Sequence, residues 1–452
     1  MTLASQISAA FPALALRTNL TKADPGLHPD NLQAGVIALP SDVAQVSALL
    51  KFCNQHKITI VPQGGRTGLA GGAVSSEGQL ILSTQNLNRI IEIDPIGQVV
   101  VVEAGVTLAN LDAALQPHGL MAGIDLGARD VATIGGLIST NAGGIEAFRH
   151  GVMRARVSGL EAVLADGTIM SDLARVAKCN EGYDVKQLLI GAEGTLGIVT
   201  KAVIRLVPRP QARATALVVC PNLTAALALF NAVPTHQLLA FEYMHADYFW
   251  LSVADRKTAA FNGLPKQGSY FIVECEGRDD TEAQARLQAA LEQGLEQGWV
   301  VDALIAKSQA EARSFWILRE DSWCVDRALP FGLWYDVTVP QAKLEVYLAT
   351  LEQGLAREAP PLKAYVIGHL GDGNVHLTIA GAAPAEPFKN QVDALVFGQL
   401  KAWGGSFSAE HGIGLEKRAA LATYGDAGKL SALRAIKAAL DPKGILNPGK
   451  VL

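Results

Sequence analysis

The stretch PQGGRTGLAGGAV, residues 62–74, decides the fold, and it follows a short apolar segment at 58–61. Two further glycine-rich stretches come later, ATIGGLISTNAGG at 132–144 and GAEGTLGIVT at 191–200. Glycine tolerates positive φ and close backbone approach, so consecutive N–H groups can turn toward a phosphate. The patterns GxGxxG and GxxxxGK[ST] are absent from the first stretch, which argues against an ordinary nicotinamide or ATP site. One such loop is as readily a surface turn, but three of them favour a phosphate-bearing cofactor.

The composition excludes several functional classes. With 452 residues, the chain is too long for one core and suits two or three domains. Its formal net charge of -5 provides no basic field to hold nucleic acid or an anionic membrane. No apolar run reaches the roughly 18 residues that a spanning helix needs. The first charged side chain is Arg17, so the N-terminus lacks the basic start of a secretion signal.

The five cysteines are widely spaced and never form a CxxC pair. An odd number without metal-binding spacing argues against a disulfide framework and a zinc ribbon, and it suits a reducing compartment. We therefore expect a cytoplasmic protein in which each cysteine is a small buried side chain. These residues are Cys53, Cys179, Cys220, Cys275 and Cys324.

The first half of the chain reads as short strands with few helices. A helix is predicted at Ser41–Asn54, with Ser41 as its N-cap. Pro208 and Pro210 break the pattern and indicate a domain boundary. Strands are predicted at 58–61, 79–83, 90–93, 99–103 and 202–207.

The second half alternates strands with helices, which predicts an antiparallel sheet with helices on one face. The expected class is α+β. Strands are predicted near 213–220, 269–276, 332–339 and 363–368, and helices near 222–232, 280–298, 341–357 and 427–440. The expected domains are 1–210, 211–405 and a C-terminal helical segment at 406–452.

Histidines flank a turn in the segment GHLGDGNVHL. If residues 371–374 close a four-residue hairpin, His369 stands opposite His376, with Cβ atoms roughly 4.5–5.5 Å apart. Two imidazoles at that distance can share a metal, and Glu410 in SAEHGIGLEKR can supply a hard oxygen ligand. Two histidines and one glutamate leave coordination positions open, as catalytic sites do. The alternative is that these histidines only form hydrogen bonds at turns.

The three glycine stretches, in this order, resemble the FAD-binding domain of the vanillyl-alcohol oxidase type, also called the p-cresol methylhydroxylase type. The resemblance covers most of residues 35–208. It implies that FAD contacts Pro62, Gly64, Gly65, Arg66, Thr67, Gly68, Leu69, Gly72, Ala73, Thr133, Gly135, Gly136, Thr140, Asn141, Gly143, Gly144, Glu193, Gly194, Gly197 and Ile198.

Two departures from this family concern the first stretch. Arg66 stands where many relatives have asparagine, and an arginine can pair with phosphate oxygens. Relatives that bind flavin covalently often have a histidine here. The sequence contains none between Val61 and Val74, so we expect non-covalent FAD.

The segments GHLGDGNVHL, SAEHGIGLEKR and LDPKGILNPGKVL resemble D-2-hydroxyglutarate dehydrogenase and the related D-lactate and glycolate dehydrogenases. The resemblance implies a divalent metal, usually zinc, although manganese, iron and cobalt stay open. Its ligands would be His369, His376 and Glu410. It also implies His411 as the catalytic base, Asn374 as a substrate-site residue, Asn447 near the flavin, and Arg319 of the LRE motif as the partner of the substrate carboxylate.

The expected reaction is oxidation of a D-2-hydroxy acid to the 2-oxo acid. The metal lowers the pKa of the alcohol, His411 takes its proton, and the C2 hydride passes to flavin N5. The electron acceptor is expected to be an electron-transfer flavoprotein or a quinone, and a homodimer is possible. Alternatives are an oxidase that uses oxygen, a non-redox ether-lipid synthase, and a non-catalytic flavin-binding subunit.

The sequence departs from the hydroxyglutarate enzymes at two positions. Those enzymes hold the distal carboxylate with a threonine and a lysine, where this chain has Trp323 and Trp334. Neither indole can neutralise a carboxylate, and each offers a large apolar face. We expect both to line a pocket for an apolar or aromatic side chain, as in mandelate, phenyllactate or lactate-like substrates. The alternative is that both tryptophans fill the core and the substrate is D-2-hydroxyglutarate or D-lactate.

Overall fold

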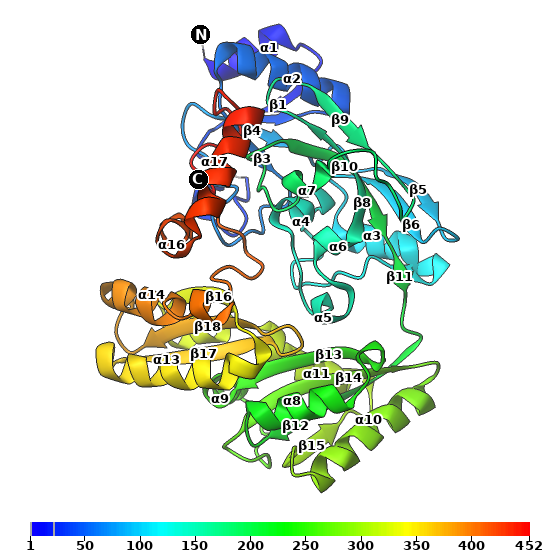
Figure 1. Cartoon of the computed structure of the whole chain (residues 1–452), viewed down its shortest axis with the longest axis vertical. Coiled ribbons are helices and arrows are strands. Elements are labelled where there is room, and N and C mark those ends of the chain that lie inside the picture. The colour runs from blue at the N-terminus through cyan, green and yellow to red at the C-terminus, as the bar shows by residue number, and fades with distance from the viewer. Residues whose placement is uncertain (1, 21–22) are drawn as a thin grey trace. The chain divides into compact units, whose positions relative to one another are not determined.

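The computed structural model describes residues 2–20 and 23–452. The chain divides into two compact units. The first contains the chain up to Gly144, His150–Arg209 and Glu410–Leu452. The second contains Ile145–Arg149 and Pro210–Ala409. Helix α5 (Ala147–His150) spans the point in the sequence where the chain returns to the first unit. Figure 1 shows the elements of each unit along the chain.

The first unit contains three sheets. One has four strands in the order β1-β2-β4-β3, with parallel pairing at β4, and another has five antiparallel strands in the order β5-β6-β10-β8-β9. Their bounds are β1 (Ala15–Arg17), β2 (Ile37–Leu39), β3 (Ile60–Gln63), β4 (Leu80–Ser83), β5 (Ile90–Asp94), β6 (Val99–Glu103), β8 (Val157–Val163), β9 (Ile169–Asp172) and β10 (Ile198–Arg205). Strands β7 (Leu120–Met121) and β11 (Val207–Pro208) form the third sheet.

The first unit also contains helices, two of which lie in its C-terminal segment. They are α1 (Leu3–Ala10), α2 (Val43–His56), α3 (Leu108–Leu115), α4 (Ile134–Thr140), α6 (Met153–Arg156), α7 (Lys186–Leu189), α16 (Arg418–Tyr424) and α17 (Ala427–Leu440). The expected N-cap of α2 is wrong by one residue. Asp42 caps this helix by accepting the Gln45 N–H at 2.8 Å, while the Gln45 side chain reaches back to the N–H of Ser41.

The second unit is built on one antiparallel sheet of seven strands, in the order β15-β12-β14-β13-β17-β18-β16. The strands are β12 (Ala212–Cys220), β13 (Leu238–His245), β14 (Ser269–Gly277), β15 (Asp302–Ile305), β16 (Leu333–Thr338), β17 (Leu362–His369) and β18 (Asn374–Gly381). The helices are α8 (Leu223–Ala232), α9 (Ala246–Asp255), α10 (Asp280–Glu296), α11 (Gln309–Glu320), α12 (Cys324–Ala328), α13 (Leu344–Glu358), α14 (Lys389–Phe397) and α15 (Leu400–Trp403).

Helices lie on both faces of this sheet, so the expectation of helices on one face is wrong. Phe249 of α9 stacks on Tyr270 of β14, with ring centroids 3.9 Å apart. Phe230 of α8 contacts Phe241 of β13 at 5.5 Å, and Phe241 contacts Phe271 at 5.3 Å. Neighbouring residues of a strand point to opposite faces, so α9 and α8 pack on different sides of β14. The sequence analysis did not identify α9 or α11.

One of the five cysteines lies at the surface. Four cysteines are buried, but Cys179 is exposed, so the expectation of five buried thiols is wrong. Within the described ranges, no helix has the length and apolar character needed to cross a bilayer.

Candidate active site

In the first unit, the first glycine stretch packs against the second at a distance that only glycine permits. A Cβ on Gly64 would lie 2.2 Å from Thr133 Oγ1, and a Cβ on Gly65 would lie 2.0 Å from the Val131 carbonyl oxygen. Thr133 is itself the N-cap of α4, where it accepts the N–H of Gly136. A side chain at either glycine would therefore separate the two stretches.

The third glycine stretch approaches the first one closely and also bonds to the C-terminal segment. Glu193 and Gly194 both have positive φ, and a Cβ on Gly194 would lie 2.3 Å from Pro62 Cγ. The Glu193 carboxylate accepts the N–H groups of Ile413 at 2.7 Å and Gly414 at 2.9 Å. Burial raises the pKa of Glu193 despite these two bonds, which act in the opposite direction.

Asn447 in the closing turn ties the C-terminus to the same loops. Its Nδ2 donates to the carbonyl oxygens of Gly72 at 3.0 Å and Glu193 at 2.8 Å. Its backbone N–H donates to the Ile60 carbonyl oxygen, at the start of β3. Lys437 of α17 adds a bond to the Thr195 carbonyl oxygen. All three glycine stretches and the last residues of the chain therefore meet in one place within this unit.

The remaining residues expected to contact FAD lie in three settings. Asn141 ends α4 with positive φ, and its Oδ1 accepts the Arg154 N–H at 2.8 Å. Gly68 and Leu69 are exposed. Ile198 is buried in the hydrophobic core. The intermediate or buried positions in or beside the loops are Pro62, Arg66, Thr67, Gly72, Ala73, Gly135, Gly136, Thr140, Gly143, Gly144 and Gly197.

Unpaired polar atoms in these loops fit a polar ligand. Among the described residues, Gln63 Oε1, Arg66 Nε and Asn447 Oδ1 are buried without a hydrogen-bond partner. A buried polar atom left unpaired is costly, so a native structure normally supplies a partner from water or a ligand. Burial also lowers the pKa of Arg66.

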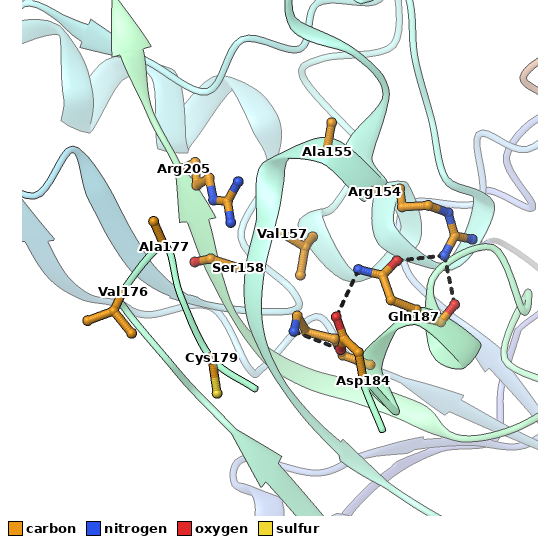
Figure 2. A pocket seen from close by; sticks show the side chains of 11 residues that line it. Arg154, Ala155, Val157, Ser158, Val176, Ala177, Cys179, Asp184, Gln187 and Arg205 are labelled. Atoms are coloured by element: carbon orange, nitrogen blue, oxygen red, sulfur yellow. Dashed lines mark hydrogen bonds and ion pairs between the residues drawn. The ribbon is translucent and has the colours of Figure 1, made fainter. Parts of the chain in front are cut away.

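A separate cavity of about 210 Å³ in the first unit is lined by other residues. Figure 2 shows Arg154 bonded to the side chain and carbonyl oxygen of Gln187, and Lys186 is paired with Asp184 at 2.7 Å. These charges are therefore already engaged by protein groups.

In the second unit, the expected pairing of His369 with His376 is wrong. The turn comprises residues 370–373, so His369 stands opposite Asn374 and His376 opposite Ile367. Asn374 belongs to the strand, where it pairs with Thr338 of β16, and its Nδ2 donates to the Val337 carbonyl oxygen at 3.0 Å. The two histidines are instead diagonal neighbours on one sheet face, with ring centroids 5.5 Å apart. One ring nitrogen of each lies within 4.8 Å of one of the other.

Glu242, which the sequence analysis missed, lies opposite His369 in β13. Its Oε1 is 2.7 Å from His369 Nδ1, and its Oε2 is 2.8 Å from Arg319 Nη2. Burial raises the pKa of Glu242, but the charges of His369 and Arg319 outweigh burial and hold it below the ordinary value. An ionised carboxylate only accepts hydrogen bonds, so His369 Nδ1 is the donor, and in the neutral ring this tautomer leaves the lone pair on Nε2.

Asp336, also missed, lies opposite His376 and is fully buried. Its Oδ1 accepts Asn374 Nδ2 at 2.9 Å and lies 3.6 Å from His376 Nδ1. Asn374 Oδ1 is buried and receives no hydrogen bond from the described part of the chain. A lone charge inside the apolar runs LLAFEYMH and LWYDVTVP is the sequence feature that marks Glu242 and Asp336.

Trp323 and Trp334 contact each other edge to face, with ring centroids 4.9 Å apart. Each is 46% exposed, so the alternative that they fill the core is wrong. Trp334 Nε1 donates to Asp326 Oδ1 at 3.2 Å. Trp334 also lies two residues before Asp336 on the same strand, so both side chains point to the same sheet face.

Glu410 and His411 begin the last segment of the first unit. Glu410 Oε1 accepts the N–H of Gly144 at 2.5 Å, which fixes the carboxylate at the end of the second glycine stretch. The preceding residue, Ala409, belongs to the second unit and donates its N–H to the Asp336 carbonyl oxygen at 3.4 Å. His411 is half-buried.

Comparison with known proteins gives two family matches and related sequences. The FAD linked oxidases, C-terminal domain, match residues 209–451, and an FAD binding domain matches residues 34–172. A D-2-hydroxyglutarate dehydrogenase of Xanthomonas citri pv. viticola is 35% identical over 422 residues, covering 92% of this chain and 88% of the relative. The mitochondrial D-2-hydroxyglutarate dehydrogenase of Rattus norvegicus is 35% identical over 423 residues, covering 92% and 78%.

Among solved structures, p-cresol methylhydroxylase with substrate bound matches with a TM-score of 0.70 and 17% identity, covering 92% of this chain and 88% of that one. This likeness shows the fold. The two family matches and the relatives that align with 92% of the chain show that this protein belongs to the FAD-linked oxidase family, as an FAD-dependent D-2-hydroxyacid dehydrogenase.

Proposed function

We propose that this enzyme oxidises a D-2-hydroxy acid whose side chain is apolar or aromatic, with the assistance of a divalent metal. The observation that carries the proposal is the arrangement of side chains on one face of the seven-stranded sheet of the second unit. There, His369 and His376 lie beside the buried Arg319–Glu242 pair, and Trp334 points to the same face. This face therefore offers imidazoles for a metal, a guanidinium for a carboxylate and an indole ring for an apolar group.

Non-covalent FAD is proposed to bind the glycine stretches of the first unit, and when bound it supplies the hydride acceptor. The unpaired Gln63 Oε1, Arg66 Nε and Asn447 Oδ1 support this placement. The positive charge of Arg66 suits the pyrophosphate.

A divalent cation is proposed to be held by His369, His376 and Glu410, and when bound it stabilises negative charge on the substrate oxygen. The donor set fits zinc, which accepts imidazole nitrogen and carboxylate oxygen. The bond from His369 Nδ1 to Glu242 supports the assignment, because metal-binding histidines usually donate their other N–H to a carboxylate. The N–H of Gly144 holds the Glu410 carboxylate in one orientation.

The chain's own residues would bind the substrate and move one proton. His411 takes the proton from the C2 hydroxyl as general base. Arg319 pairs with the C1 carboxylate, while its bond to Glu242 keeps the guanidinium in place. Asn374, whose Oδ1 is buried and available to a donor, would line the substrate site. Trp323 and Trp334 contact the side chain on C2 and exclude water from it.

Anaerobic flavin reduction across a substrate panel tests this function. We expect kcat/KM to be at least about tenfold larger for D-mandelate and D-phenyllactate than for D-2-hydroxyglutarate, because the two indoles bind an apolar group and leave a second carboxylate unpaired. Bleaching near 450 nm reports the reduction. Metal analysis of the same sample is expected to find about one divalent ion per chain. A larger kcat/KM for D-2-hydroxyglutarate contradicts the proposed side chain, and full activity of metal-free protein contradicts the metal.

Replacing Asn447 with Ala is expected to weaken FAD binding about 5- to 100-fold, because two buried carbonyl oxygens lose their donor, at roughly 1–3 kcal/mol in total. Release of FAD fluorescence on dilution measures the affinity. Asn110→Ala, at an exposed position in α3, is the matched control. Equal FAD affinity of N447A and wild type would show that the closing turn does not support the cofactor loops.

A further inference from the structure

Asp326 is hydrogen-bonded to one of the two tryptophans. It belongs to the short helix α12, and its Oδ1 accepts the Nε1–H of Trp334. Trp334 in turn meets the ring of Trp323. The only hydrogen-bond donor of the Trp334 indole is thus used within the protein. What this indole presents to a ligand is its apolar ring.

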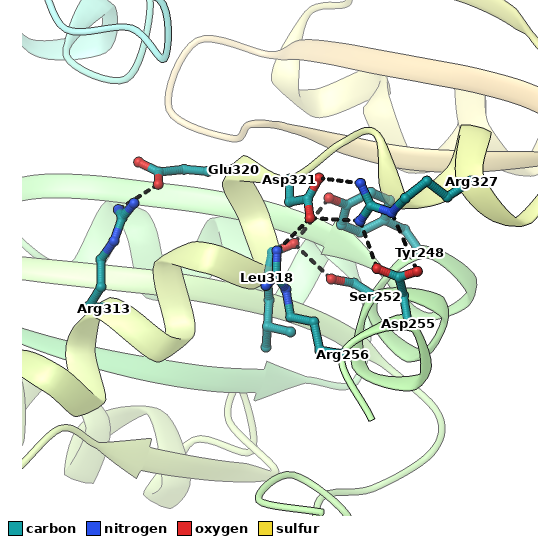
Figure 3. Close-up of polar contacts among 9 residues, drawn as sticks. All are labelled: Tyr248, Ser252, Asp255, Arg256, Arg313, Leu318, Glu320, Asp321 and Arg327. Atoms are coloured by element: carbon teal, nitrogen blue, oxygen red, sulfur yellow. Dashed lines mark hydrogen bonds and ion pairs between the residues drawn. The ribbon is translucent and has the colours of Figure 1, made fainter. Parts of the chain in front are cut away.

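Among the described residues Asp326 forms no ion pair, although the charge of Arg327 acts on it. Its neighbour Arg327 is engaged elsewhere, at 2.6 Å from Asp255 and 2.7 Å from Asp321, as Figure 3 shows. In the described part of the chain, no lysine, arginine or histidine forms an ion pair with Asp326. Burial raises the pKa of Asp326, while the hydrogen bond from Trp334 and the charge of Arg327 act in the opposite direction.

The position of this charge follows from the strand register. Trp334 stands opposite Thr378, and Asp336 opposite His376, on one face of β16 and β18. Residues two apart on a strand are roughly 7 Å apart. The pair of Asp326 and Trp334 is therefore one step along the strand from the proposed substrate site. A group extending from C2 of the substrate toward Trp334 would meet this negative charge.

We propose that Asp326 is a specificity-determining residue that disfavours substrates with a second carboxylate through charge repulsion. This inference rests on the proposed function, because it requires the substrate side chain to lie against the tryptophans. Two like charges some 6–8 Å apart at a half-exposed site repel by enough to change a binding ratio about tenfold. The tryptophans favour apolar side chains, and Asp326 acts against acidic ones.

Asp326→Asn tests the charge, because it keeps an oxygen acceptor for Trp334 Nε1 and removes the negative charge. The paired substrates are D-2-hydroxyglutarate and D-2-hydroxyvalerate, which have the same carbon chain and differ in the terminal carboxylate. We expect the ratio of their kcat/KM values, diacid over monoacid, to rise about tenfold in D326N. Asp280→Asn, at the exposed start of α10, removes the same charge elsewhere in this unit and is expected to leave the ratio unchanged.

A second measurement varies the ionic strength, and its first part needs only the wild-type protein. Raising the ionic strength screens repulsion between partly exposed charges. The wild-type ratio is therefore expected to rise several-fold between low and high salt, and the D326N ratio to stay nearly constant. An unchanged ratio in D326N, or a salt response equal in both proteins, overturns the role of Asp326. If the wild type already prefers the diacid, the proposed apolar substrate fails instead.

Discussion

Replacing His411 with Ala is expected to slow anaerobic flavin reduction by D-mandelate about 10²- to 10⁴-fold, the range that a positioned general base contributes. His411 directly follows Glu410, whose carboxylate is held by the N–H of Gly144. The backbone that carries the imidazole is therefore fixed. FAD is expected to stay bound, because its proposed contacts come from the glycine stretches. Stopped-flow bleaching of the flavin near 450 nm measures the rate.

Two controls separate loss of the base from loss of the fold. His236→Ala changes an exposed histidine and is expected to leave reduction unchanged. His411→Gln keeps hydrogen-bonding groups but cannot take a proton at neutral pH, so it is expected to lose as much activity as H411A. Rapid reduction by H411A with FAD in place would remove His411 from the base role.

The parts of the fold that could be predicted from the sequence depend on local interactions. Helix α17 occupies the predicted residues 427–440, because its apolar spacing and its capping Asp426 are both local. The glycine stretches could be identified from their local composition, although their close contacts are not local. Gly64 meets Thr133 and Gly194 meets Pro62, each far away in the sequence. What a short segment determines can be derived from that segment.

The parts that could not be predicted depend on pairing between distant segments. In the observed register of β17 and β18, Asn374 pairs with Thr338 of β16 and bonds to Asp336 and Val337, and no pattern within GHLGDGNVHL contains these partners. Glu242 is 127 residues from His369 in sequence, and their contact exists only because β13 pairs with β17. The turn lies one residue earlier than predicted, which changes the register by two residues and places His376 diagonally from His369. The two rings still share a face, because the shift conserved the alternation of side chains.

Arg319→Met is expected to destabilise the protein by about 3–5 kcal/mol, because it leaves the carboxylate of Glu242 buried without its cation. The side chains of Arg319 and Glu242 are only 9% and 1% exposed, so water cannot replace the lost partner. Glu242→Gln is expected to cost a similar amount by leaving Arg319 uncompensated. The shift of the urea unfolding midpoint, followed on the FAD-bound protein, measures both effects.

The double variant E242Q/R319M separates stability from substrate binding. A neutral buried pair has no isolated charge, so most of the lost stability is expected to return, within about 1–2 kcal/mol of wild type. R319M is also expected to reduce its flavin slowly with D-mandelate, because the substrate carboxylate lacks its guanidinium, and the double variant is expected to stay at that low rate.

The matched control is Arg313 with Glu320 on the same helix, a pair that is 61% and 29% exposed. There, R313M and E320Q are expected to cost less than about 1 kcal/mol and to show little coupling. Additive losses at Arg319 and Glu242 would contradict a coupled buried pair, and recovered activity in the double variant would contradict the role of Arg319 in binding the carboxylate.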